Sequence, residues 1–99
     1  ARPKLFMVFG ESERAVCFAD VDALRVSGCR VLYSYRANAG FGKQLKEASQ
    51  CGCSHALIYG SDELADGEVT VKDLGSGTAK RVKREELASF IAALDMKGS

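Results

Sequence analysis

The chain has 99 residues, which is the length of one domain with a small hydrophobic core. Hydrophobic residues make up 46% of the sequence, and this fraction excludes a disordered chain. The longest apolar run falls far short of the roughly 20 residues that a membrane-spanning helix needs, so we expect no membrane partner. A net charge of +1 indicates no general preference for nucleic acid, and DNA is not an expected partner.

Strand and helix patterns alternate along the first half of the chain. A continuous apolar run that ends at a glycine predicts a buried central strand at Lys4–Phe9. Helical spacing of apolar residues predicts helices over 11–27 and 41–50. Between and after them, β-favouring residues predict strands over 29–35 and 55–59. The apolar face of the second helix is predicted to consist of Phe41, Leu45 and Ala48.

Turn signals set the pattern in the second half. Residues 61–64 predict a short turn of helix, and the alternation around 69–71 predicts a half-buried strand. Gly75-Ser76-Gly77 is typical of a hairpin loop, and residues 79–83 are its return strand. A closing helix is predicted from Arg84 to about 96.

These elements predict an α/β fold of three layers in a single domain, residues 1–99. Two strand–helix units lead to parallel pairing through right-handed crossovers, and the hairpin adds antiparallel strands. We therefore expect a mixed five-stranded sheet with about three helices, in the order βαβαβββα. The chain opens with Ala1-Arg2-Pro3 and no initiator methionine, so we also expect it to be excised from a larger chain.

The cysteines and the single histidine give no sign of a metal or catalytic site. Cys51 and Cys53 flank one glycine, and the sequence has no Cys-x-x-Cys pair to chelate zinc. We expect all four cysteines to be reduced and structural, as in a cytosolic protein. His55 is the only histidine, so neither a Ser-His-Asp triad nor a two-histidine metal site has support. The predicted catalytic residues and metal ligands are therefore none.

Charge is segregated along the chain although it nearly cancels in the sum. Residues 23–46 contain bases and no acid, residues 61–73 contain acids and Lys72 as their one base, and residues 80–84 are basic again. One interpretation is a set of solvated faces. The other is a basic rim for phosphates beside a small acidic pocket that reads bases. Composition alone does not choose between them.

Three motifs in chain order carry a family resemblance. They are Asp22-Ala23-Leu24-Arg25-x-x-Gly28, then Lys43-Gln44-Leu45-Lys46-x-Ala48, then Gly60-x-x-Glu63-Leu64 with Asp66-Gly67-x-Val69-x-Val71-Lys72-Asp73-Leu74-x-x-Gly77. This combination resembles the C-terminal anticodon-binding domain of histidyl-tRNA synthetase, a class IIa aminoacyl-tRNA synthetase. The resemblance covers nearly the whole chain and implies the same mixed five-stranded fold.

The resemblance also implies RNA-binding residues. Glu63 matches the family carboxylate beside the anticodon bases, and Lys72 matches a basic position that faces the same pocket. Residues near the anticodon backbone, where cations neutralise phosphate, are Arg36, Lys43, Gln44 and Lys46. Either Tyr35 or Phe41 would stack on a base. The alternatives are an aromatic at the edge of the core for Tyr35 and an ordinary surface charge for Lys46.

For function, the resemblance implies tRNA recognition within an enzyme that attaches histidine to tRNA-His. That parent enzyme uses ATP and Mg²⁺ in a catalytic domain, whereas this piece is expected to be non-catalytic and to need no cofactor. The expected partners are the anticodon stem-loop of tRNA-His, the catalytic domain of its own parent chain, and a second copy in a homodimeric parent. We expect a cytoplasmic location, with an organellar form left open.

Three other roles stay open at this point. The chain is alternatively a regulatory or tRNA-sensing domain of a protein that is not a synthetase. It is also compatible with a structural role in packing a dimer, or with a module that binds a small molecule.

Overall fold

A computed structural model describes residues 4–34 and 40–98, the last four by their backbone alone. The strands are β1 (Lys4–Phe9), β2 (Arg30–Tyr33), β3 (His55–Tyr59), β4 (Glu68–Asp73) and β5 (Ala79–Lys83). The helices are α1 (Arg14–Val26), α2 (Phe41–Gln50), α3 (Ser61–Ala65) and α4 (Leu87–Gly98). Two single 3-10 turns, η1 (Glu11–Glu13) and η2 (Arg84–Glu86), lead into α1 and α4.

The five strands form one mixed sheet in the order β2-β1-β3-β4-β5. β1 pairs in parallel with β2 on one side and with β3 on the other, where Phe9 is level with Tyr59. β4 and β5 add antiparallel pairs, in which Thr70 is level with Arg81. The predicted mixed sheet, with its two parallel pairs and its hairpin, is confirmed.

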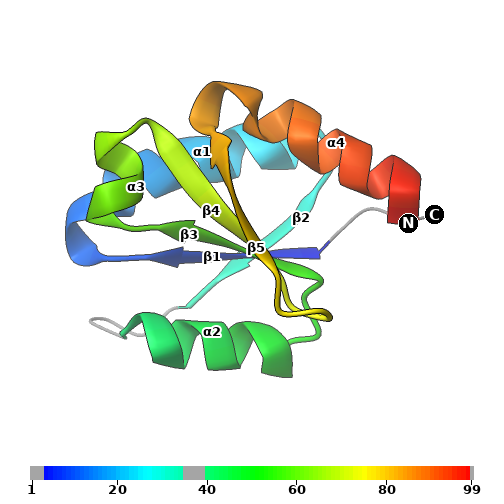
Figure 1. Cartoon of the computed structure of the whole chain (residues 1–99), viewed down its shortest axis with the longest axis horizontal. Helices are drawn as coiled ribbons and strands as arrows, with labels where there is room; N and C mark the ends of the chain where they lie inside the picture. Colours follow the sequence, from blue (N-terminus) through cyan, green and yellow to red (C-terminus); the bar gives the residue numbers. More distant parts are fainter. Residues whose placement is uncertain (1–3, 35–39, 99) are drawn as a thin grey trace.

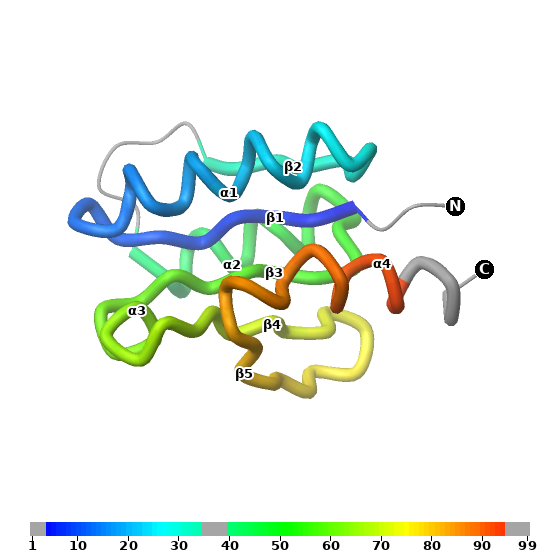
Figure 2. The backbone as a smooth tube through the Cα atoms, turned by 90° about the horizontal axis from the view of Figure 1, so that it is seen from above, coloured from blue at the N-terminus to red at the C-terminus, as the bar shows by residue number. Residues whose placement is uncertain are grey.

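Helices cover the two faces of the sheet unequally. In Figure 1, α1, α3 and α4 lie above the sheet, whereas α2 alone lies below it. The connections β1–α1–β2 and β2–α2–β3 cross the sheet in opposite directions, and right-handed crossovers in opposite directions place their helices on opposite faces. Figure 2 shows α1 over the β1–β2 side and α4 over the β3–β4 side. No helix within residues 4–34 and 40–98 has the length and apolar character to cross a membrane.

Each helical layer has its own hydrophobic core. The larger core joins the sheet to α1 and α4 through buried residues such as Met7, Leu24, Val69 and Ile91. The smaller core joins the sheet to α2, and its buried members are Phe6, Val8, Ala48, Cys53 and Ala56. No described residue of β4 or β5 belongs to the smaller core, so the α2-side face of these two strands is left uncovered.

Most predicted element bounds agree with the structure. The bounds of β1, α2, β3 and β5 are those expected from the sequence. β2 is shorter than the predicted strand over 29–35 because its pairing with β1 ends where Met7 meets Tyr33. The structure has four α-helices among the described residues, not about three, because the short turn expected after Gly60 closes into the helix α3.

The predicted apolar face of α2 is wrong at one position. Phe41 is 37% exposed, whereas Gln44 is only 4% exposed and takes the inward place. The Gln44 Nε2 donates to the Phe9 carbonyl at 2.9 Å, and its Oε1 accepts from the Phe9 N–H at 3.1 Å. A buried amide is tolerated there because both of its polar ends are bonded. These bonds fasten the start of α2 to the end of β1.

A polar network ties three distant segments together on the other side of the sheet. Tyr59 is fully buried, and its hydroxyl donates to Asp20 Oδ2 at 2.6 Å. The Arg84 guanidinium donates to the two oxygens of the same carboxylate at 2.9 and 3.1 Å. Burial, followed by the hydrogen bond to Asp20, raises the pKa of Tyr59 well above its ordinary value. This network fixes the entry into α4 on α1 and β3, and the sequence analysis did not anticipate it.

The two outer strands of the sheet differ in how their free edges are covered. In β2, the Arg25 guanidinium donates to the Val31 carbonyl at 2.9 Å and lies 5.9 Å from the centre of the Tyr33 ring. The edge strand β5 instead carries three exposed cations, Lys80, Arg81 and Lys83.

Candidate nucleic-acid interface

The candidate interface lies on the α2-side face of β4 and β5. Val69, Val71 and Val82 point into the core beneath α4. Because side chains alternate along a strand, Thr70, Lys72 and Arg81 lie on the opposite face, which α2 does not cover. We call the group of Glu63, Thr70, Lys72 and Arg81 the open face.

Glu63 is held at the edge of the open face by the turn that starts α3. Its Oε2 accepts a hydrogen bond from the Thr70 hydroxyl at 3.2 Å. The carboxylate folds back over Gly60, where a Cβ would lie 2.6 Å from Glu63 Oε1. Glycine therefore gives the room in which the carboxylate sits. An ionised carboxylate has several acceptor positions, so Glu63 keeps the capacity to accept hydrogen bonds from a ligand.

The two cations of the open face have different surroundings. Arg81 pairs with Asp66 at 3.0 Å and with Glu68 at 3.5 Å, so its charge is largely neutralised. Lys72 is half-buried, and no described acidic side chain forms an ion pair with it. Lys72, unlike Arg81, is therefore available to an anionic ligand.

Two more cations lie on α2. Lys43 and Lys46 are both exposed and are three residues apart, so they share the solvent side of the helix. α2 packs on the same face of the sheet as Lys72. Cations of this kind attract phosphates without reading sequence.

The structure separates the predicted RNA-binding residues into three groups. Glu63 and Lys72 share the open face, and Lys43 and Lys46 lie on the helix beside it. Gln44, predicted near the RNA backbone, is buried and bonded to Phe9, where it holds the start of α2 on β1. Tyr35 and Arg36 lie outside the described residues.

Two residues of the open face, Thr70 and Arg81, are not among the residues predicted from the sequence. Thr70 stands between two valines of an alternating strand, and this pattern already places it on the face opposite to theirs. The contact between Thr70 and Glu63 joins β4 to α3 and has no local signal.

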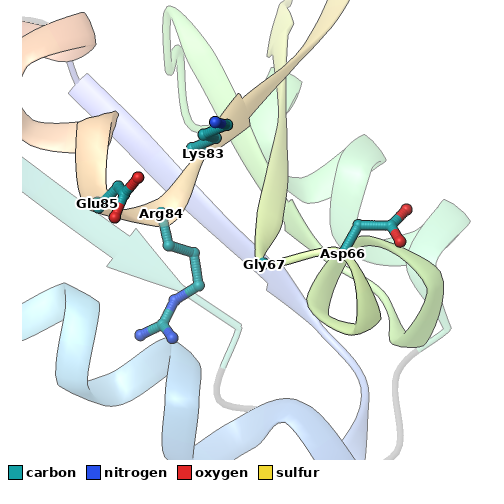
Figure 3. A pocket seen from close by; sticks show the side chains of 5 residues that line it. All are labelled: Asp66, Gly67, Lys83, Arg84 and Glu85. Atoms are coloured by element: carbon teal, nitrogen blue, oxygen red, sulfur yellow. The ribbon is translucent and has the colours of Figure 1, made fainter.

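Within residues 4–34 and 40–98, two observations bear on a metal site and on a small-molecule site. No three His, Cys, Asp or Glu side chains gather to hold a metal ion within the part of the chain that the structure describes. A cavity of about 580 Å³ is lined by Asp66, Gly67, Lys83, Arg84 and Glu85. Figure 3 shows that these side chains point in different directions, and Arg84 is already bonded to Asp20. Small-molecule sites instead have polar groups that converge on the ligand.

Comparison with known proteins decides the family. Residues 7–94 match a family model described as an anticodon binding domain. The chain belongs to the anticodon-binding domain family. This anticodon-binding domain is 42% identical over 85 residues to the histidine–tRNA ligase of Opitutus terrae, a match that covers 86% of the domain and 19% of that ligase. It is 45% identical over 80 residues to the ligase of Aquifex aeolicus, which covers 80% of the domain and again 19% of the relative.

Solved structures show the same architecture. The anticodon-binding domain superposes on the histidyl-tRNA synthetase from Nostoc sp. PCC 7120 with a TM-score of 0.79 and 27% identity, over 92% of the domain and 22% of that chain. The apo histidyl-tRNA synthetase of S. aureus gives a TM-score of 0.81 at 21% identity, over 91% and 23%, and so shows the fold. The chain spans about a fifth of the length of the curated relatives it matches.

Proposed function

We propose that this chain is the C-terminal anticodon-binding domain of a histidyl-tRNA synthetase, and that its open face reads the anticodon of tRNA-His. The observation that carries the proposal is the Glu63 carboxylate, which Thr70 holds at 3.2 Å on the sheet face that α2 leaves uncovered and that also carries Lys72. The relatives are named histidine–tRNA ligases, and we take the amino acid and the tRNA of the proposal from that name.

Recognition divides between one acidic group and several basic ones. Glu63 accepts hydrogen bonds from the amino or imino groups of a splayed base, which is how single-stranded RNA is read. Lys72, Lys43 and Lys46 neutralise phosphates and so hold the loop against the domain. Binding the anticodon in this way favours tRNA-His and orients the molecule so that its acceptor end reaches a remote catalytic site.

Catalysis is assigned to the remainder of a longer parent. The parent would use ATP and Mg²⁺ to activate histidine in a catalytic domain outside this chain, which spans only about a fifth of the length of the relatives. We propose a homodimeric, cytoplasmic parent. The cytoplasm is proposed from the cysteine usage of the sequence, which has four cysteines and no Cys-x-x-Cys pair.

The proposal is tested by the binding of two RNA stem-loops at one fixed salt concentration. One is the anticodon stem-loop of tRNA-His, and the other has the same stem with a scrambled anticodon. We expect the cognate loop to bind more tightly, by about 1–3 kcal/mol for each base that is read. Equal affinity for both loops, or no binding of either, would refute the anticodon-reading role and favour the regulatory or tRNA-sensing alternative.

Variants then separate the two kinds of contact. Glu63→Ala should narrow the difference between cognate and scrambled loops, whereas the control Asp22→Ala, on the exposed side of α1, should not. Lys43→Ala should weaken both loops about equally and reduce the slope of log affinity against log salt by about one. Its control is Lys80→Ala, on the α4 side of β5, where Lys80 lies over the Phe90 ring. Intact discrimination in Glu63→Ala would show that the base-reading residue is wrongly assigned.

A further inference from the structure

The ends of β1 and β3 carry the same turn. β1 is followed by Gly10-Glu11-Ser12-Glu13, and β3 is followed by Gly60-Ser61-Asp62-Glu63. Both glycines are extended residues that begin a helical turn, and Phe9 is level with Tyr59 in the parallel pair. Neighbouring strands lie about 4.8 Å apart, so the two turns lie side by side at the carboxyl ends of β1 and β3.

In the first turn, a carboxylate and an aromatic ring approach the same point. A Cβ on Gly10 would lie 2.5 Å from Glu13 Oε1 and 3.7 Å from Cε1 of Phe41. Glu13 thus repeats the position of Glu63, with the carboxylate folded over the glycine. The Phe41 ring comes from α2, on the far side of the sheet from α1, and reaches the end of β1.

Contacts among the described residues leave the Phe41 ring partly exposed and the Glu13 carboxylate without a hydrogen-bond donor. Phe41 is 37% exposed although it is a large apolar side chain, and the bonds of Gln44 to Phe9 hold its helix in place. Thr70 binds Glu63, but among the described residues none donates a hydrogen bond to the Glu13 carboxylate. The structure therefore leaves an acceptor group beside an exposed ring, immediately next to the open face.

We propose that Phe41 and Glu13 form a second base-binding subsite, which takes an unstacked guanine next to the base read by Glu63. Phe41 stacks on the base, a contact that any base can make. The Glu13 carboxylate accepts hydrogen bonds from N1–H and N2–H, and guanine is the base whose Watson–Crick edge offers two adjacent donors to such a group. This inference rests on the proposed function, because it places a second nucleotide of the same RNA loop.

The stacking part is tested with ring variants. Phe41→Ala should weaken binding of the tRNA-His anticodon stem-loop by about tenfold, and Phe41→Tyr should bind within about twofold of the parent chain. The control is Val26→Ala, which alters another exposed large apolar side chain, at the far end of α1. Thermal unfolding of each variant shows whether the domain remains folded. A Phe41→Ala variant that is folded and binds like the parent chain would overturn the subsite.

The hydrogen-bonding part is tested by replacing each guanine of the loop in turn with inosine, which lacks the N2 amino group. We expect one such replacement to weaken binding to the parent chain by about fivefold and to have no effect on Glu13→Ala, which lacks the acceptor oxygens. If inosine changes binding to the parent chain and to Glu13→Ala by the same factor at every position, the assignment of Glu13 is wrong. If the Glu13 test fails while Glu63→Ala still narrows the difference between cognate and scrambled loops, the subsite is wrong and the proposed function stands. If the parent chain does not bind the cognate loop at all, the subsite and the proposed function are both wrong.

Discussion

Removal of the Tyr59 hydroxyl is predicted to destabilise the domain through the network on Asp20. Tyr59→Phe keeps the buried ring and opens no cavity, so the change isolates one hydrogen bond, of 2.6 Å, to a carboxylate. Bonds of this kind to a charged group contribute about 1.5–3 kcal/mol. We expect the free energy of unfolding to fall by about 2 kcal/mol, which in a domain of this size lowers the Tm by roughly 10 °C.

The assay is urea unfolding followed by circular dichroism, run as a double-mutant cycle with Asp20→Ala. Tyr59→Phe should cost less in the Asp20→Ala background than in the parent chain, because its partner has already gone, with a coupling energy of about 1–2 kcal/mol. Asp22→Ala, two residues along the same helix and exposed, serves as the control for α1. A Tyr59→Phe variant within about 0.5 kcal/mol of the parent chain, or an additive cycle, would refute the reasoning.

Two further predictions concern proton release and thiol chemistry. Burial and the bond to Asp20 raise the pKa of Tyr59, and burial, then Asp20, raises the pKa of Cys17 to about 12. The unfolded chain releases both protons at lower pH, so the free energy of unfolding should fall as pH rises above about 9, and Tyr59→Phe should flatten that fall in urea titrations between about pH 8 and 11. A thiol reagent at about pH 8, followed by mass spectrometry, should modify the exposed Cys51 first and the buried Cys17 only on unfolding; equal rates would contradict the burial.

Local patterns predicted the elements well because their causes are local. The strand at Lys4–Phe9 is a single apolar run, and its burial on both faces follows from that composition. The face of Val31 and Tyr33, opposite to Leu32, follows from strand alternation and agrees with the two cores. For the open face, a family motif supplied Glu63 and Lys72, and alternation around Val69 and Val71 was enough to place Thr70.

The misplaced and missed residues depend on contacts between distant segments. Gln44 reads as a polar surface residue, and only the free N–H and carbonyl of Phe9, 35 residues earlier, make it an inward one. Asp20 binds Tyr59 and Arg84, which lie 39 and 64 positions away. One local signal was present: Asp20 lies on the same helical face as Cys17 and Leu24, and an acid on an apolar face needs a partner.

The two outer strands bear on how the chain behaves at high concentration. An unpaired strand edge is a template for another chain, and proteins protect such edges with short strands and with charge. Arg25 already occupies the Val31 carbonyl on the four-residue β2, and the lysines and arginine of β5 repel a second copy of that strand. Strand-by-strand association is thereby disfavoured at both edges of the sheet, in a domain whose net charge of +1 gives little colloidal repulsion.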